Sequence, residues 1–358
     1  MVRTIQPLKV LYVGLHHDYG DARRGLCYEY VNLLGSMKQM ESIRVDFFPV
    51  DDVLRREGRN GMNRKLIECV AEEKPDICFF VLFTDEVSKE TIRTISERSG
   101  AKTLNWFCDD HWRFDTFSKL WAPHFHWVVT TDRNAVERYH AIGVHNVIRS
   151  QWGFSQHLMM PSATSQDVDV SFVGQVHSRR RRSISRLSQA GITVRCWGKG
   201  WNQGRIGQEE MFRLFGRSKI NLNFAESSNT PGLKSFAKVF LNRRADNTFH
   251  FNSLPMMASH ALSLFSGNRP QIKARNFEIP GHGGFLLTSE VDGLEEYYTI
   301  GKEIVCFKSL DDLADKIRFY LENDEQRETI RIAGQQRTLS DHTYARRIHE
   351  ILASIGSV

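Results

Sequence analysis

Short apolar runs alternate with amphipathic stretches through the first half of the chain. Runs with the length and the β-branched and aromatic content of buried strands lie at 8–15, 44–50, 77–83, 101–108 and 127–131. The spacing of apolar positions between them predicts helices at 25–38, 63–73, 89–98 and 135–143. Buried strands that alternate with helices indicate a parallel sheet covered on both faces. Ligands of such sheets bind beyond the carboxyl ends of the strands.

The same alternation returns in the second half. Predicted strands lie at 170–174, 192–198, 220–224, 285–289 and 303–307, with helices at 208–218 and 309–323. The pattern predicts an α/β protein with two doubly wound, Rossmann-like domains that face each other across a cleft. We place an N-terminal domain at 1–155, a C-terminal domain at 167–340 and a C-terminal helix at 341–358. The segment 225–270 interrupts the second array and is interpreted as a partly helical insertion.

The composition fits two folded domains. The chain has 358 residues, of which 41% are hydrophobic and 25% are charged. It contains no apolar run of about 18 residues, and its first residues lack the apolar core of a signal peptide. The six cysteines are scattered without a CxxC pair, which favours reduced thiols over a structural zinc site. We therefore expect a soluble, cytoplasmic protein.

The net charge of +6 favours anionic partners such as phosphates, nucleic acids or a membrane surface. Only the stretch SRRRRS at 178–183 is densely basic, and a smaller basic patch, LNRRAD, lies at 241–246. The charge is modest, so it does not by itself select one of these partners.

The segment 271–290, QIKARNFEIPGHGGFLLTSE, combines cations, a carboxylate and glycines directly before a predicted strand. Arg275 can hold a phosphate through two parallel hydrogen bonds, and the two oxygens of Glu278 can accept both hydroxyls of a ribose. Glycines such as Gly283 and Gly284 allow the backbone to approach a ligand closely. These groups suit a nucleoside diphosphate. The alternative is a helix cap and turn with a local Arg–Glu ion pair.

Two further loops are candidates for phosphate binding. One predicted strand ends at Gly174, and the arginines 179–182 then open a helix, where cations oppose the helix dipole unless an anion is bound. We expect one or two of these arginines to face a ligand; the alternative is a solvated charge run. The loop CWGKGWNQG at 196–204 places Lys199 among glycines, although a plain turn after the strand also explains its spacing.

In the first half, polar clusters follow two predicted strands. The residues concerned are His16, His17 and Asp18 after the first strand, and Asp109, Asp110 and His111 after the fourth. Each cluster pairs a carboxylate with an imidazole at the edge where a doubly wound sheet binds ligands. We interpret His16, Asp110 and His111 as candidate catalytic residues; the alternative for either cluster is a surface loop.

Some motifs are absent. The sequence lacks GxxxxGK[ST], HExxH and GxSxG, which argues against P-loop, zincin and α/β-hydrolase sites. The triplet Asp167-Val168-Asp169 has the DxD form of metal-dependent sugar transferases. It leads into a predicted strand near the domain boundary, so we discount it as a metal site.

The second half resembles a known family. The segments that carry the resemblance, in order between residues 167 and 355, are SFVGQVHSRRRRSI, GITVRCWGKGW, SKINLNF, QIKARNFEIPGHGGFLLTSE, GKEIVCF and DHTYARRIHEIL. They resemble the C-terminal half of the CgeB-like (spore maturation protein-like) glycosyltransferases, which are related to family 4 enzymes of GT-B fold. The first half resembles this family only in its strand–helix order and in the segment WFCDD.

The resemblance implies a glycosyltransferase whose C-terminal domain binds a UDP- or GDP-linked sugar and whose N-terminal domain binds the acceptor. It assigns ribose binding to Glu278 and places the turn 283–285 near the diphosphate, which Arg180 would hold together with Arg275 or Lys273. The predicted donor site comprises Gly174, Arg180, Lys199, Lys273, Arg275, Glu278, Gly283, Gly284 and Phe285.

The same resemblance implies transfer with retention, without a bound metal or other cofactor. Cationic side chains and a helix N-terminus would stabilise the departing diphosphate, which would accept the acceptor's proton. If the configuration inverts instead, Asp110 or a nearby histidine would be the general base. The family 4 pattern has a glutamate eight residues before Glu278, where this chain has Pro270. The position of the sugar therefore does not transfer from the family.

Two other classes of function fit the sequence. One is a non-catalytic nucleotide-binding module, which the proline at position 270 favours. The other is a nucleic-acid-directed protein, either a binder or a DNA base glycosyltransferase, that uses the basic stretches 178–183 and 241–246. The acceptor class stays open among glycan, lipid, protein, small molecule and nucleic acid, and the basic patches also suit a membrane surface.

Overall fold

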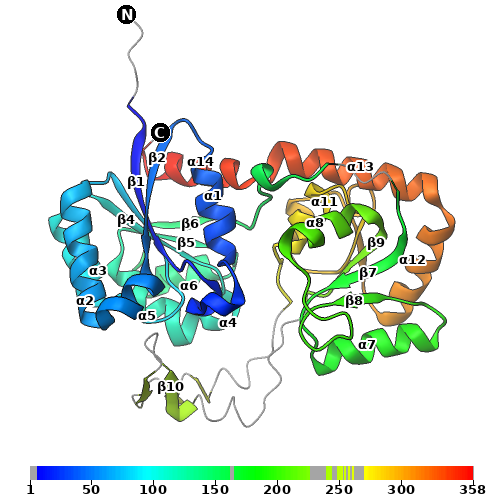
Figure 1. The fold of residues 1–358 in the computed structure, drawn as a ribbon, viewed down its shortest axis with the longest axis horizontal. Coiled ribbons are helices and arrows are strands. Elements are labelled where there is room, and N and C mark those ends of the chain that lie inside the picture. Colours follow the sequence, from blue (N-terminus) through cyan, green and yellow to red (C-terminus); the bar gives the residue numbers. More distant parts are fainter. Residues whose placement is uncertain are drawn as a thin grey trace, which may run out of the picture. The chain divides into compact units, whose positions relative to one another are not determined.

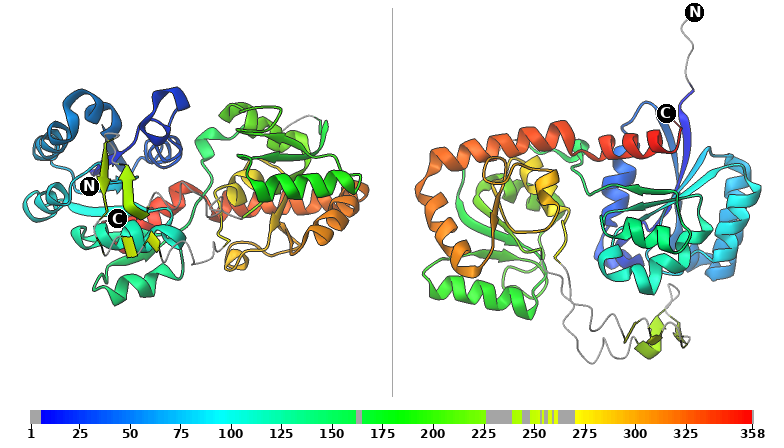
Figure 2. Two further views of the ribbon diagram at one scale, coloured as in Figure 1. Left: turned by 90° about the horizontal axis from the view of Figure 1, so that it is seen from below. Right: turned by 180° about the vertical axis from the view of Figure 1, so that it is seen from behind.

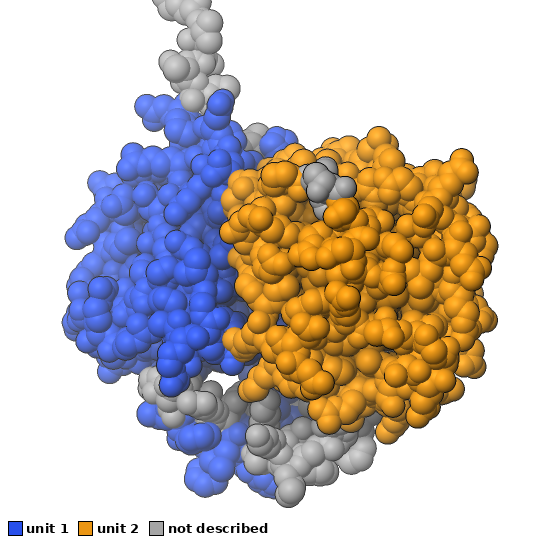
Figure 3. Space-filling model, turned by 45° about the vertical axis from the view of Figure 1, so that its right-hand side comes forward, with its two compact units in different colours: residues 1–151, 229–268, 347–358 blue, residues 152–228, 269–346 orange. Residues whose placement is uncertain are grey.

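The chain forms two compact units, which Figure 3 shows in different colours. The structure, a computed structural model, describes residues 6–161, 165–225, 239–243, 248–252, 254, 257–258, 260–261 and 270–357. Unit 1 comprises residues 1–151, 229–268 and 347–358, and unit 2 comprises residues 152–228 and 269–346. Apart from residues 229–268, which belong to unit 1, the chain passes from unit 1 to unit 2 after Gln151 and returns within α14 (Tyr344–Ser354). The sequence predicted domains at 1–155 and 167–340.

Unit 1 contains a six-stranded, fully parallel sheet (Figure 1). Its strands, in spatial order, are β2 (Ile43–Pro49), β1 (Leu8–Gly14), β3 (Ile77–Val81), β4 (Lys102–Phe107), β5 (Trp127–Thr130) and β6 (Val147–Arg149). The chain leaves β1 for β2 on one side and then crosses to β3 on the other. The order of the strands therefore reverses between β1 and β3.

Helices cover this sheet because alternate strand residues point to opposite faces. Val13 and Phe80 enter a core cluster with Leu66 of α2, whereas Tyr12 and Phe79 stack on the opposite face with their rings 5.9 Å apart. The helices are α1 (Gly35–Met37), α2 (Val50–Glu73), α3 (Lys89–Arg98), α4 (Asp110–Arg113), α5 (Lys119–Trp121) and α6 (Ala135–Ala141). Further helical turns lie at Asp18–Gly20, Ala22–Arg24, Tyr30–Leu34, Phe114–Ser118 and Ala122–His124.

Unit 2 contains a five-stranded parallel sheet. Its strands, in spatial order, are β13 (Val305–Phe307), β12 (Leu286–Ser289), β9 (Ser218–Asn223), β7 (Val168–Val173) and β8 (Arg195–Trp197). Its helices are α7 (Ser178–Gln189), α8 (Gln208–Arg217), α11 (Arg275–Gly281), α12 (Leu310–Glu322) and α13 (Asp324–Asp341), with short turns at Gln156–Leu158 and Leu294–Glu296. The order of strands reverses between β7 and β9. The two parallel sheets confirm the predicted α/β class.

The core of unit 2 lies between the sheet and two long helices. Phe172 and Leu222 pack with Leu187 of α7 and Ile317 of α12. Helix α8 lies on the other face, where the carbonyl oxygen of Phe215 accepts a hydrogen bond from the Asn221 side chain at 3.0 Å. Figure 2 shows the helices of unit 2 from two further directions.

Most of the predicted insertion at 225–270, with half of its basic patch, lies outside the described residues. Its described part includes a small antiparallel hairpin of β10 (Leu241–Arg243) and β11 (Phe249–Phe251). Within the described ranges, no helix combines the length and the apolarity that crossing a membrane requires.

Candidate functional site

In unit 1, a pocket of about 250 Å³ lies at the carboxyl ends of β1, β3 and β4. Because the strand order reverses between β1 and β3, this is the topological switch point of the sheet, where open α/β sheets bind ligands. The residues of its wall that matter for ligand chemistry are Tyr12, Asp18, Tyr19, Glu29, Asp109 and Arg113.

Carboxylates give this pocket its chemical character. Burial raises the pKa of the Glu29 carboxyl, and the nearby Asp109 and Asp18 carboxylates also act to raise it. The thiol of Cys27 donates a hydrogen bond to Glu29 Oε2 at 2.9 Å. Among the described residues, the Asp109 carboxylate forms no hydrogen bond or ion pair. The pocket therefore offers hydrogen-bond acceptors to a ligand that carries hydroxyl or amino groups.

Arg113 is the pocket's cation, and other parts of the protein hold it in place. Its guanidinium donates to the carbonyl oxygen of Phe83 at 2.6 Å and lies 4.2 Å from the centroid of the Phe117 ring. Tyr19, on the pocket wall, has a positive φ of 54°, and its ring meets that of Phe83 edge-on at 5.0 Å. Aromatic edges beside carboxylates form a surface suited to a polyhydroxylated ligand.

Asp110, predicted to be catalytic, is fully buried at the start of α4. Its Oδ2 accepts hydrogen bonds from Thr130 at 2.6 Å and from Tyr139 at 2.8 Å. Burial raises the pKa of this carboxyl to about 6. His111 follows it on α4, with its ring 6.5 Å from that of Trp112. Catalysis by Asp110 or His111 stays a prediction; of the three residues, only Asp109 lines the pocket.

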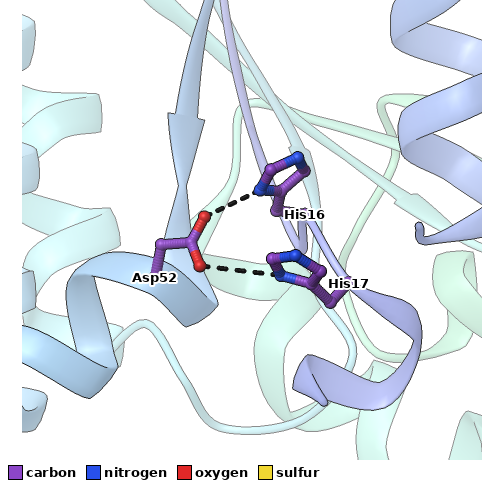
Figure 4. A group of neighbouring side chains, drawn as sticks. All are labelled: His16, His17 and Asp52. Atoms are coloured by element: carbon purple, nitrogen blue, oxygen red, sulfur yellow. Dashed lines mark hydrogen bonds and ion pairs between the residues drawn. The ribbon is translucent and has the colours of Figure 1, made fainter. Parts of the chain in front are cut away.

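His16 lies beyond the end of β1 in a cluster with His17 and Asp52 (Figure 4). His16 Nδ1 is 2.7 Å from Asp52 Oδ2, and His17 Nδ1 is 3.6 Å from Asp52 Oδ1. Asp51, only 5% exposed, accepts the backbone N–H of His16 at 2.6 Å and lies 2.9 Å from His17 Nδ1. Since β1 and β2 are neighbours, the residues that follow β1 meet those that open α2.

Asp51 and Asp52 were not among the site residues predicted from the sequence. The signal was their position directly after a predicted strand, next to the strand that precedes His16 and His17. Glu29, which lines the pocket, was not predicted either, because it lies inside a predicted helix and belongs to no motif.

In unit 2, the loops that carry Gly174 and Lys199 come together beyond β7 and β8. The N–H of Val176 donates to the carbonyl oxygen of Lys199 at 3.0 Å, and Trp201 Nε1 donates to that of Gly174 at 2.8 Å. Gly198 has φ 132°, and a Cβ there would collide with the Gly174 carbonyl. The glycine-rich spacing therefore serves a close approach of two backbones, and the side chain of Lys199 is left exposed.

Arg180 reaches the switch point of this second sheet. Its guanidinium donates to the carbonyl oxygen of Gln175 at 2.9 Å, after β7, and to that of Phe224 at 3.3 Å, after β9. The arginines on either side, Arg179 and Arg181, are exposed. One arginine of the basic run thus lies at the edge where a ligand is expected.

Lys273 is held near the same edge by a buried amide. Asn276, fully buried, accepts the N–H of Lys273 at 2.9 Å, and the side chain of Asn223 donates to the same oxygen at 3.2 Å. Asn223 ends β9 and also donates to Thr288 of β12 at 3.1 Å. The structure therefore brings Gly174, Arg180, Lys199 and Lys273 to the carboxyl edge of the sheet.

Arg275 and Glu278 form an ion pair with each other on α11. Arg275 also contacts the sulfur of Met211 at 3.0 Å. Glu278 is 2% exposed, and within the part of the chain that the structure describes its Oε1 has no hydrogen-bond partner. The local ion pair of the alternative interpretation is thus present, and ribose binding by Glu278 stays a prediction.

The predicted turn 283–285 lies at the opposite edge of the sheet. It precedes the first residue of β12, whereas Gly174 follows the last residue of the parallel strand β7. Gly283 has φ 72°, its carbonyl accepts a hydrogen bond from Arg331 at 2.9 Å, and Phe285 is fully buried in the core. This placement separates the turn from Gly174, Arg180, Lys199 and Lys273, whereas Arg275 and Glu278 lie on the helix that leads into it. Its contact with a diphosphate is untested.

The two aspartates of the DxD triplet carry salt bridges. Arg217 binds Asp167 at 2.5 Å, and Lys219 binds Asp169 at 2.7 Å. Both carboxylates are thus engaged beside the start of β7, at the amino edge of the sheet.

Comparisons with known proteins agree with this architecture. The family described as "Glycosyl transferase-like" has a model that matches residues 179–353. Sucrose-phosphate synthase from Thermosynechococcus elongatus is 12% identical, with a TM-score of 0.60 over 98% of this chain and 99% of its own. HepE from Anabaena, solved in complex with UDP, is 11% identical, with a TM-score of 0.61 over 98% and 100% of the two chains.

A protein from Listeria monocytogenes described as a UDP-N-acetylglucosamine 2-epimerase is 10% identical, with a TM-score of 0.52 over 98% of this chain and 96% of its own. No curated protein matches the sequence. At these sequence identities, the structural similarities support only the fold and not a function. The chain has the GT-B fold, with two parallel-sheet α/β units.

Proposed function

We propose that the protein is a glycosyltransferase that moves a sugar from a nucleotide-sugar donor, bound by unit 2, to an acceptor bound by unit 1. The observation that carries the proposal is the match of residues 179–353 to the glycosyl transferase-like family. This region supplies Arg180, Lys199 and Lys273, and all three belong to the carboxyl edge of the second sheet.

The donor is a UDP-sugar in this proposal. HepE, which shares the fold, has been solved in complex with UDP and with UDP-glucose. Three cations at one sheet edge suit a diphosphate, because they offset the negative charge that develops on the leaving group. The diphosphate then needs no metal ion. Membership of the CgeB-like glycosyltransferases, which the sequence resembles, is part of the same proposal.

The acceptor binds at the pocket of unit 1, where Asp109 and Glu29 offer hydrogen-bond acceptors. Transfer proceeds with retention: the acceptor attacks from the face that the diphosphate leaves, and the leaving phosphate takes the proton. For inversion, the described residues offer a base in His16, whose Nδ1 is oriented by Asp52 at 2.7 Å.

Calorimetric titration of UDP into matched variants tests the donor site. Arg180→Gln removes a cation at the switch point, and we expect UDP affinity to fall about 10-fold to 100-fold, the loss of a charge-assisted hydrogen bond. Arg181→Gln, the exposed neighbour on the same helix, should change affinity less than about 2-fold. Equal losses of UDP affinity in both variants would contradict the proposed donor site. A wild-type protein that does not bind UDP would contradict it as well.

The reaction itself is tested by NMR of a UDP-sugar incubated with a panel of sugar and glycan acceptors. A new glycosidic bond with the anomeric configuration of the donor supports the proposal in full. A product with the inverted configuration supports a transferase and assigns the role of general base to His16. The variant His16→Gln should then be inactive. A change of configuration within the sugar without transfer, as the name of the Listeria protein describes, would overturn the proposal.

A further inference from the structure

We propose that His16, His17 and Asp52 form a binding site for a divalent transition-metal ion of the zinc type. Each of the three side chains offers a ligand atom, and these atoms all lie within 4.8 Å of one another. Figure 4 shows both imidazoles turned toward the carboxylate of Asp52 from the loop after β1. The proposal does not depend on the proposed function.

The ligand set matches the chemistry of such an ion. Two imidazoles and one carboxylate are ligands that Zn²⁺ accepts, and three protein ligands leave a position open for water or a substrate oxygen. The side chains of His16, His17 and Asp52 are 29%, 17% and 25% exposed, so an ion can enter from solvent. None of the three is locked in the hydrophobic core.

Asp51 supplies the surroundings that a metal-binding histidine usually has. Histidine ligands commonly donate their second ring N–H to a carboxylate, which fixes the orientation of the ring. His17 Nδ1 is 2.9 Å from Asp51 Oδ2, which leaves His17 Nε2 for an ion. Asp51 also accepts the backbone N–H groups of both histidines, at 2.6 and 3.2 Å, and so holds the loop against α2.

One cation already competes for the site. Arg55 Nη1 lies 3.1 Å from Asp52 Oδ1, and the Arg55 side chain is 53% exposed. An ion bound by Asp52 would be repelled by this nearby cation, whose exposed contact with the carboxylate is worth little in water. The competition gives the proposal a distinctive consequence, because removal of Arg55 should strengthen metal binding.

An ion here would have a chemical use at this edge of the sheet. It lowers the pKa of a water or hydroxyl group bound at its open position. In the proposed transferase, that position would take a hydroxyl of the acceptor; this step alone rests on the proposed function.

The test is calorimetric titration of Zn²⁺ into the full-length protein after treatment with a chelator. We expect one tight site in wild type, at least 10-fold weaker binding in His17→Ala and in Asp52→Asn, and several-fold tighter binding in Arg55→Gln. The matched control is His140→Ala, since the exposed rings of His140 and His145 lie 5.7 Å apart and form a histidine pair elsewhere in unit 1. This variant should bind Zn²⁺ like wild type.

Substitution with Co²⁺ identifies the ligands. We expect the wild-type protein with bound Co²⁺ to show visible absorption bands, and His17→Ala to lose them. We expect no sulfur-to-cobalt charge-transfer band in the near-ultraviolet. The absence of this band excludes the thiols of Cys27 and Cys108 as ligands. Circular dichroism of each variant shows whether it is folded. The proposal fails if the wild-type protein binds no Zn²⁺. It also fails if His140→Ala abolishes Zn²⁺ binding while His17→Ala and Asp52→Asn retain it. In either case the cluster consists only of His–Asp hydrogen bonds without a metal ion. UDP binding is measured separately, so either proposal can fail without the other.

Discussion

Asp109 and Asp110 are adjacent in the chain, yet their carboxylates have different surroundings. Asp109 lines the pocket, whereas Asp110 points inward to Thr130 and Tyr139. The sequence placed both at a strand end and could not tell them apart, because the direction of a side chain at a strand–helix junction depends on the tertiary packing. The buried carboxylate has consequences for stability that can be measured.

Asp110→Asn should remove a pH dependence from the stability of unit 1. Burial raises the pKa of Asp110 from an ordinary 3.8 to about 6. Between these pH values the folded protein keeps a proton that the unfolded chain loses, so this stabilisation is present below about pH 4 and is lost as the pH rises through 6. The difference corresponds to about 3 kcal/mol.

Urea unfolding of both proteins from pH 4 to pH 7 measures this effect. The free energy of unfolding of wild type should fall by up to about 3 kcal/mol relative to Asp110→Asn as the pH rises. A constant difference across this range would mean that the carboxyl titrates normally. If the variant also transfers sugar at the wild-type rate, the predicted catalytic role of Asp110 ends.

At the level of elements, the apolar runs predicted ten of the strands, since buried parallel strands are continuously hydrophobic. The three-residue strand β6 was missed, because Val147–Arg149 is too short to show a period. The prediction ended a strand at Val50, where α2 begins. The meeting of His16 with Asp52 depends on the pairing of β1 with β2, and local periodicity does not encode strand order.

Helix α13 gives an element-scale prediction at Gly334. A Cβ at this position would collide with the carbonyl oxygen of Glu303, a backbone atom that cannot turn aside. Alanine gains up to about 1 kcal/mol of helix propensity over glycine, but overpacking typically costs about 1 to 3 kcal/mol. We expect Gly334→Ala to destabilise unit 2 by about 1 to 2 kcal/mol.

Chemical denaturation with a control in the same helix decides the sign. Gln336→Ala, at an exposed position of α13, changes propensity without a clash and should leave the midpoint within experimental error. A stabilised Gly334→Ala protein would show that α13 can move away from Glu303 at little cost.

At the scale of the whole molecule, the sequence was more informative about one unit than about the other. The motifs of residues 271–290 and 178–183 fall in unit 2, where most of the family match also lies. Unit 1 carries the acidic pocket and the histidine cluster, which the sequence showed only as polar strand ends. Two sheets with separate cores also imply that each unit has a stability of its own.

Scanning calorimetry with ligands tests this division. UDP at about a hundred times its dissociation constant stabilises the unit that binds it by about 2.7 kcal/mol, which raises the transition temperature of a domain of this size by roughly 5 to 10 °C. We expect UDP to raise the temperature of the transition that Gly334→Ala lowers, which is that of unit 2. We expect Zn²⁺ to raise the transition temperature of unit 1. A single transition that responds to all three changes would contradict independent unfolding of the units. If UDP raised only the transition that Gly334→Ala leaves unchanged, the donor would belong to unit 1, because a ligand stabilises only the part of the chain whose folded form it binds.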